Sequence, residues 1–354
     1  MGSQPQTRLP VSRRQGPVEV DVGASSGARY NPSRTWLGLC MVGMVAVGSV
    51  ASFLPRPIPA VPPTRVQPQQ MSINGVAQAG TNLVAAGELG HLFVSRDAGR
   101  QWDEASVSPQ RGSTLTQVFS ANPALALAVG HDGWILRSED AGQSWKEASF
   151  DGETGNALMS VWGNPAGPFF AVGSFGGFLV STDQGQTWQQ RNIGLGDRHL
   201  YGVAGTGPDR MMLVGESGLA ARSTDGGQNW TRLTGFYTGS LFGLLALSGN
   251  DWLAFGMRGR VFRSIDFGQS WAPIESGTER ALYGGTLTRD GRVVLVGEGG
   301  VVTVSADRGA TFQLLHAGSG PTFSSVGQTH DGHLIYTGQQ GMTFENIPLA
   351  TSNH

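Results

Sequence analysis

Two patterns that recur about every 42 residues, and one long charge-free run, predict the fold class of this 354-residue chain. The first is Ser-x-Asp-x-Gly-x-x-Trp, which occurs six times between Ser95 and Phe312, with Phe in place of Trp in the last copy. The second is a Gly-x-x-Gly turn between two apolar runs, which occurs seven times. A repeat of this length is typical of a propeller blade and not of a helical repeat. The sequence therefore predicts an all-β, seven-bladed β-propeller of four-stranded antiparallel blades, preceded by a single N-terminal transmembrane helix.

The residues of the first pattern are those that a tight turn requires. An Asp side chain in a turn accepts hydrogen bonds from backbone N–H groups that have lost their strand partners, and the Gly two places later supplies a positive φ. The aromatic residue opens the next strand and is expected to bury its ring between neighbouring repeats. The aspartates are Asp97, Asp140, Asp183, Asp225, Asp266 and Asp307, and the aromatic residues are Trp102, Trp145, Trp188, Trp230, Trp271 and Phe312.

This pattern resembles the Asp-box, or bacterial neuraminidase, repeat. The resemblance implies a structural turn at the rim of a propeller, away from its working face. The other interpretation, metal or acid chemistry at these aspartates, is disfavoured because a catalytic group is seldom needed in six equivalent copies. We therefore expect the six Asp boxes to be structural.

Each repeat also contains the strands that complete a blade. The Gly-x-x-Gly turn joins two apolar runs into a hairpin, as at Gly173 to Gly176. An inner strand such as 158–161 precedes the hairpin, and an outer strand opens at the Asp-box aromatic. The seventh repeat ends before an outer strand. Counting back from the first inner strand predicts that residues 60 to about 67 supply this strand and close the ring, as an edge strand that tolerates proline.

The amino-terminal region divides into three segments. Residues 1–35 are polar, with five Arg against two acidic residues, and are expected to be a disordered basic segment on the cytoplasmic side. Residues 36–54 carry no charge and are long enough for a membrane-spanning signal anchor. Residues 55–70 are a Pro-rich stalk, and 71–354 form the propeller. The alternative for the apolar segment is a cleavable signal peptide.

Composition excludes several classes of function. The first 35 residues hold five of the 24 basic and two of the 26 acidic residues, which leaves 19 basic and 24 acidic residues for the rest. Such a mildly acidic body argues against a nucleic-acid surface. Cys40 is the only cysteine, so no disulfide and no thiolate metal site is expected. No cofactor is expected either.

The hairpin turns and the loops between blades are predicted to share one face, opposite the Asp boxes, and to bind a partner. Arg198 and Arg280 each precede a Leu-Tyr-Gly strand start and are expected to point toward the axial opening. The alternative is that each arginine caps or salt-bridges a neighbouring loop. Phe236 and Tyr237 are either ordinary packing or part of an interaction hot spot. The candidate partner-binding residues are His131, Arg198, His199, Glu216, Tyr237, Arg258, Arg280 and Glu298.

An enzymatic function is not expected. Sialidases are six-bladed and use an Arg triad with a Tyr nucleophile, and only Arg56-Pro-Ile-Pro59, in the stalk, imitates their Phe-Arg-Ile-Pro motif. A generic glycosidase needs two carboxylates roughly 5–10 Å apart. The candidates Glu88, Glu216 and Glu298 belong to blades that are not adjacent.

The combined unit of Val-Gly-x-x-Gly, an apolar run and the Asp box covers about residues 71 to 345. It makes the chain similar to the photosystem II stability and assembly factor family. The resemblance implies a non-catalytic assembly chaperone on the lumenal or periplasmic side that holds membrane subunits. We therefore expect a single-pass inner-membrane scaffold with its propeller in the periplasm or lumen, bound to an integral membrane complex such as a transporter. The alternative is a sialidase-like or other glycoside hydrolase, or a carbohydrate-binding propeller.

Overall fold

The computed structural model describes residues 32–53 and 66–345. The chain divides into two compact units, Met1–Thr64 and Arg65–His354. In the first unit, helix α1 (Pro32–Phe53) starts at a proline, a residue that suits the first turn of a helix because its missing N–H is not needed there. The helix has 22 residues and is about 33 Å long. Its segment Trp36–Phe53 is apolar and long enough to cross a membrane.

The second unit consists of seven sheets, numbered here as blades 1 to 7 in chain order. The innermost strands are β1 (Ile73–Ala79), β6 (Leu115–Ser120), β10 (Leu158–Gly163), β14 (Leu200–Thr206), β18 (Leu241–Ala246), β22 (Leu282–Leu287) and β26 (Phe323–Gln328). The second strands are β2 (Asn82–Gly87), β7 (Ala126–Gly130), β11 (Phe169–Gly173), β15 (Arg210–Gly215), β19 (Trp252–Gly256), β23 (Val293–Gly297) and β27 (Leu334–Gly338).

The third and fourth strands complete the blades. The third strands are β3 (Leu92–Ser95), β8 (Ile135–Ser138), β12 (Phe178–Ser181), β16 (Ala220–Ser223), β20 (Val261–Ser264), β24 (Val302–Ser305) and β28 (Gly341–Glu345). The outer strands are β4 (Asp103–Glu104), β9 (Ser144–Ser149), β13 (Gln189–Gln190), β17 (Thr231–Arg232), β21 (Ala272–Ile274) and β25 (Gln313–His316).

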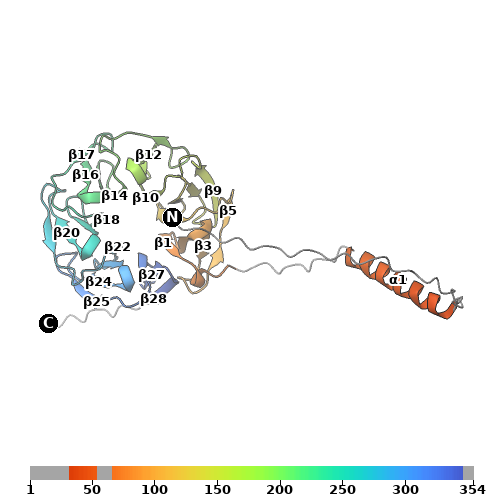
Figure 1. Ribbon diagram of the computed structural model, residues 1–354. Helices are drawn as coiled ribbons and strands as arrows, with labels where there is room; N and C mark the ends of the chain where they lie inside the picture. Colours follow the sequence, from red (N-terminus) through yellow and green to blue (C-terminus); the bar gives the residue numbers. More distant parts are fainter. Residues whose placement is uncertain (1–31, 54–65, 346–354) are drawn as a thin grey trace, which may run out of the picture. The chain divides into compact units, whose positions relative to one another are not determined.

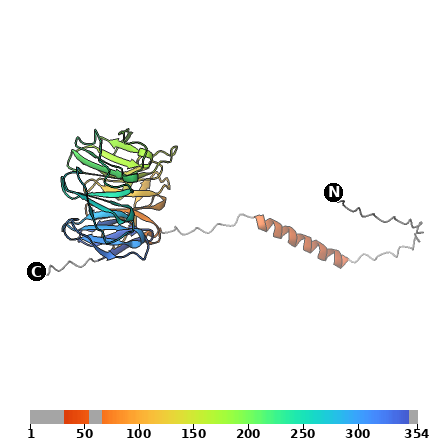
Figure 2. The same ribbon diagram turned by 60° about the vertical axis from the view of Figure 1, so that its left-hand side comes forward.

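The blades form a closed ring (Figure 1), which Figure 2 shows turned by 60°. Each inner strand contacts the inner strands of the blades before and after it, and β26 of blade 7 contacts β1 of blade 1. Within a blade, consecutive strands pair antiparallel. The predicted seven-bladed propeller is therefore confirmed.

The core lies between neighbouring blades. Every residue of β7, β11, β19, β23 and β27 is buried, because these strands are covered on both faces. One cluster joins Phe170 and Phe178 of blade 3 to Leu200 and Leu213 of blade 4. Since each blade buries its apolar faces only against the blades on either side, the ring is stable as a whole and not blade by blade.

Apolar contacts between blades 7 and 1 close the ring. Ile335 of β27 packs with Val76 and Leu83 of blade 1, and Met342 of β28 packs with the buried residues around Phe93. The 3-10 helix η1 (Pro68–Gln70) contacts β28. The predicted closing strand, residues 60 to about 67, lies outside the described residues except for 66 and 67, which are not in a strand. Over the described residues, blade 7 has three strands.

Blade 2 differs from the predicted four strands. The segment β5 (Ser106–Ser108), which leads from blade 1 into blade 2, pairs in parallel with the outer strand β9 and makes a fifth strand. Strand β9 has six residues and offers a longer edge than the two-residue outer strands β13 and β17. Arg111 donates two 2.8 Å hydrogen bonds to the Glu147 carboxylate and fixes the connection against β9.

We expect the closing contact to contribute measurably to the stability of the ring. Replacing Met342 by Ala removes a half-buried side chain from the seam between blades 7 and 1, and should lower the free energy of unfolding by about 1–3 kcal/mol. Thr343→Ala is the matched control, because Thr343 is the next residue of β28 and is exposed. Denaturant unfolding of both variants tests this expectation, and equal stabilities would contradict it.

Candidate partner-binding face

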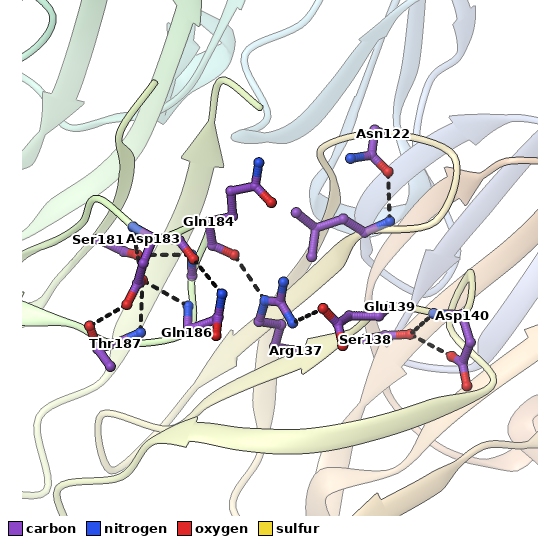
Figure 3. Close-up of polar contacts among 12 residues, drawn as sticks. Asn122, Arg137, Ser138, Glu139, Asp140, Ser181, Asp183, Gln184, Gln186 and Thr187 are labelled. Carbon is purple, nitrogen blue, oxygen red and sulfur yellow. Dashed lines mark hydrogen bonds and ion pairs between the residues drawn. The ribbon is translucent and has the colours of Figure 1, made fainter. Parts of the chain in front are cut away.

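Each Asp box is closed by hydrogen bonds that occupy its carboxylate. In blade 3 the Ser181 hydroxyl donates to Asp183 Oδ1 at 2.7 Å, and the same oxygen accepts the backbone N–H groups of Gln186 and Thr187. Asp183 Oδ2 accepts the Thr187 hydroxyl at 2.6 Å. Figure 3 shows these bonds beside the box of blade 2, where Ser138 bonds Asp140. The carboxylates therefore serve the turn.

These bonds stabilise the ionised form of the aspartates. The hydroxyls of Thr187 and Ser181, in that order, lower the pKa of Asp183 to about 2. The pKa of Asp225 is also lowered to about 2, first by the backbone N–H of Asn229. No group of three or more His, Cys, Asp or Glu side chains in the described residues could hold a metal ion.

The aromatic residues of the Asp boxes pack between blades or close the turn. Trp145 is buried and its indole N–H donates to the Gly142 carbonyl at 3.0 Å. The rings of Trp102 and Trp188 are placed in the same way, with hydrogen bonds to Gly99 and Gly185. Trp230 packs edge-on against Phe170 and Phe178 of the preceding blade. Trp271 packs against the cluster shared by blades 4 and 5, and Phe312 against the cluster shared by blades 5 and 6.

Hydrogen bonds divide the turns between two faces. The Asp-box turns lie beside the turns between inner and second strands, as Phe267 N–H donates to the Asn250 carbonyl. The hairpin turns lie beside the loops between blades, as Gly176 N–H donates to the Arg198 carbonyl. We call the second set of turns the hairpin face. Gly218 shows why its turns need glycine, since its φ is +71° and a Cβ there would meet the Tyr237 carbonyl.

Three glutamates of the hairpin face bind their own blade. Glu88, Glu216 and Glu298 each follow the first Gly of a hairpin. Their carboxylates accept the backbone N–H groups of Ser72, His199 and Ala281, at 3.2, 3.3 and 3.3 Å, just before the inner strand. His131 holds the same place in blade 2 and is exposed. One oxygen of each glutamate is thus used to fix an inner strand.

The three candidate arginines lie on the hairpin face outside the axis. Arg198 is half-buried and Arg258 is exposed at the tip of the 3-10 turn η5 (Met257–Gly259). Arg280 is exposed, and its side chain lies against Gly299 and Gly318 in neighbouring loops. The residues that line the axial cavity include none of the three. This placement of Arg280 matches the alternative of contact with a neighbouring loop.

Phe236 and Tyr237 take part in packing. The Phe236 ring stacks on Trp271 with ring centroids 4.7 Å apart. The Tyr237 ring packs on Phe262 at 5.2 Å, and its hydroxyl donates to the Met257 carbonyl at 3.1 Å. The pair therefore joins blades 4 and 5, and Tyr237 is only partly exposed.

The residues that line the axis were not among the sequence candidates. Every inner strand has a bulge at its second residue, where the register shifts. These seven residues line a cavity of about 170 Å³: Asn74, Thr116, Met159, Tyr201, Phe242, Tyr283 and Ser324. Three of them are the middle residue of a Leu-x-Gly motif, at 200–202, 241–243 and 282–284, and this repeated motif is the sequence signal that could have identified them.

An aromatic row crosses blades 3 to 6 at this cavity. Tyr201, Phe242 and Tyr283 are neighbours with ring centroids 5.3 Å apart at both steps. His199 extends the row, 6.1 Å from Tyr201 and 4.9 Å from the exposed Phe175. The Phe175 backbone N–H donates to His199 Nδ1 at 3.2 Å, so the second ring nitrogen carries the proton in the neutral form.

The sequence model described as "Photosynthesis system II assembly factor YCF48" matches residues 129–330, more than half of the chain. The chain belongs to the YCF48 family. The family resemblance predicted from the repeats is thereby confirmed. A comparison with curated proteins gave no match.

Solved structures share the YCF48 fold. YCF48 bound to a D1 peptide matches 82% of this chain and 100% of its own, with 17% identity and a TM-score of 0.63. YCF48 from Cyanidioschyzon merolae matches 78% of this chain and 95% of its own, at 14% identity and a TM-score of 0.61. The WD40 β-propeller domain of Doa1 matches 78% of this chain and 93% of its own, at 15% identity and a TM-score of 0.64. At these identities the similarity shows the fold alone.

The lowered pKa of Asp183 predicts how an Asp box responds to pH. Asp183→Asn should lower the Tm at neutral pH by about 2–4 °C, because the ionised carboxylate holds several turn bonds. A carboxyl whose pKa falls from 3.8 to about 2 on folding stabilises the protein above about pH 4 and loses this effect as the pH drops toward 2. The difference in Tm from the parent protein should therefore shrink over this range.

Asp197→Asn is the control for this measurement, since Asp197 is exposed in a loop of the hairpin face. This substitution should leave the Tm nearly unchanged at pH 7 and at pH 2.5. A Tm difference for Asp183→Asn that is the same at pH 7 and pH 2.5 would contradict the assignment.

Proposed function

We propose that this chain is a non-catalytic assembly factor, tethered to the membrane, that holds a peptide segment of an integral membrane protein complex on its hairpin face. Membership of the YCF48 family is the observation that carries the proposal. A YCF48 of similar fold is bound to a D1 peptide, which supports peptide binding as the mode of action. A transporter is one complex that such a factor could serve.

The distribution of exposed side chains supports the choice of face. Leu89 and Phe175 stand at the tips of hairpin turns with 60% and 65% of their surface exposed. Met257, in the hairpin turn of blade 5, and Tyr283, at the axis, are each 37% exposed. Aromatic and large apolar groups with charged neighbours are typical of interaction hot spots. His131, Arg198, Arg258 and Arg280 would form the polar rim around them.

The carboxylates of the described residues favour binding over hydrolysis. The Asp-box carboxylates hold turns, and Glu88, Glu216 and Glu298 are fixed to the backbones of three blades that are not adjacent. A glycosidase requires two carboxyl groups on opposite sides of one bond. The sialidase-like motif Arg56-Pro-Ile-Pro59 lies outside the described residues.

Helix α1 supports the tether. Five arginines precede its apolar segment, which favours a cytoplasmic amino terminus and export of the propeller to the periplasm or lumen. A propeller held in this way would meet the exposed loops of membrane proteins at high local concentration.

The tether is tested by extraction from membranes. The full chain should stay in the membrane pellet after an alkaline carbonate wash, because the segment Trp36–Phe53 of its helix is apolar and carries no charge. A chain lacking residues 1–53 should be recovered in the soluble fraction. Release of the full chain by carbonate would contradict a membrane span.

The docking face is tested by site-specific photocrosslinking in cells. The photoreactive residue p-benzoylphenylalanine replaces Phe175 on the hairpin face in one variant and Ile265 in another. Ile265 is the matched control, since it is apolar, 72% exposed and part of an Asp box on the opposite face. A membrane-protein adduct is expected from position 175 and none from position 265. Equal adducts, or an adduct from 265 alone, would contradict the proposal.

A further inference from the structure

The axial cavity has two chemically different halves. Asn74, Thr116 and Ser324, from blades 1, 2 and 7, line it with small polar side chains. Tyr201, Phe242 and Tyr283 line it from blades 4, 5 and 6 with neighbouring rings. The faces of aromatic rings carry negative electrostatic potential and attract cations.

Two carboxylates stand next to this aromatic half. Glu216 Oε2 accepts the N–H of His199, two residues before Tyr201, and Glu298 Oε2 accepts the N–H of Ala281, two residues before Tyr283. The pKa of Tyr201 is raised, mainly by burial and to a smaller extent by the negative charge of Glu216. The pKa of Tyr283 is raised in the same way, by burial first and by the charge of Glu298 second. Neither glutamate forms an ion pair with another described residue. The aromatic row continues past Tyr201 to His199 and Phe175, so the Glu216 side offers the larger aromatic surface.

We propose that this pocket binds one cationic side chain, an arginine of the partner peptide, between the aromatic row and Glu216. The inference rests on the proposed function, since it names the residue type of the partner that the hairpin face would recognise. A guanidinium group can stack on aromatic rings while it donates hydrogen bonds to a carboxylate, which an ammonium group does less well.

The size of the pocket fits this occupant. Its volume of about 170 Å³ corresponds to about five or six water molecules, less than the pockets that enclose drug-sized ligands. One extended side chain can enter this volume, whereas a folded element cannot. Phe175 and His199, which continue the aromatic row outward, would contact the residues that flank the arginine.

The test uses the full chain in detergent micelles, labelled with 3-fluorotyrosine and observed by fluorine NMR. The probe is the peptide acetyl-Gly-Ser-Arg-Ser-Gly-amide, and its neutral counterpart has citrulline in place of arginine. The chain has five tyrosines. The signals of Tyr201 and Tyr283 should shift with the arginine peptide, whereas those of Tyr237 and Tyr336 should not. The citrulline peptide should bind at least fivefold more weakly.

Three substitutions test which carboxylate and which aromatic ring bind the arginine. Glu216→Gln keeps an acceptor for the His199 N–H and removes the charge, and it should weaken binding of the arginine peptide about five- to tenfold. Glu88→Gln is the matched control, because Glu88 accepts the equivalent bond from Ser72, two residues before Asn74 of the polar half. It should change the affinity less than twofold. Phe242→Leu should weaken binding by removing the central ring.

The outcomes separate this inference from the proposed function. Equal affinity for both peptides, equal effects of the two glutamate variants, or unshifted Tyr201 and Tyr283 signals would overturn the arginine pocket. If crosslinks then still form from position 175, the hairpin face binds its partner by other contacts. Selective binding of the arginine peptide without such crosslinks would keep the pocket and overturn the docking face.

Discussion

The structure depends on the burial of the second strand of every blade between two neighbours. Residues such as Leu213 and Leu253 are fully buried because an adjacent blade covers them. An isolated blade would expose these side chains to water, so closure of the ring is a condition for stability and not an addition to it. The seam between Ile335 and Val76 is therefore as important as any contact within a blade.

The two faces of the ring use their carboxylates differently. On one face the polar side chains of the Asp boxes are occupied by their own turns, as the bonds of Asp183 show. On the other face Glu216 and Glu298 use one oxygen each to fix an inner strand, and aromatic rings border the axis. This difference in how the carboxylates are used supports the proposal that a partner binds where the hairpins and inter-blade loops meet.

The repeat determined how much could be predicted. Residues equivalent to Gly215 and Asp225 recur at fixed intervals, because a blade needs a close approach between two strands at the first place and a tight turn at the second. The number of blades was counted from these positions. The axial residues escaped prediction because they differ in type from blade to blade, as Asn74 and Met159 do. The sequence left open whether Tyr237 packs or belongs to a hot spot, because its contact with Phe262 is a tertiary contact without a local signal. The three-residue strand β5 was too short to detect.

Every inner strand has a bulge, and the residue at the bulge lines the axial cavity without taking part in strand pairing. Met159, Tyr201 and Phe242 stand at bulges and line the cavity, and none belongs to the buried clusters between blades, so exchanging one of them alters the cavity and not the core. Divergent descendants of such a ring could therefore acquire new ligand preferences through single codon changes at these seven sites while the scaffold is inherited intact.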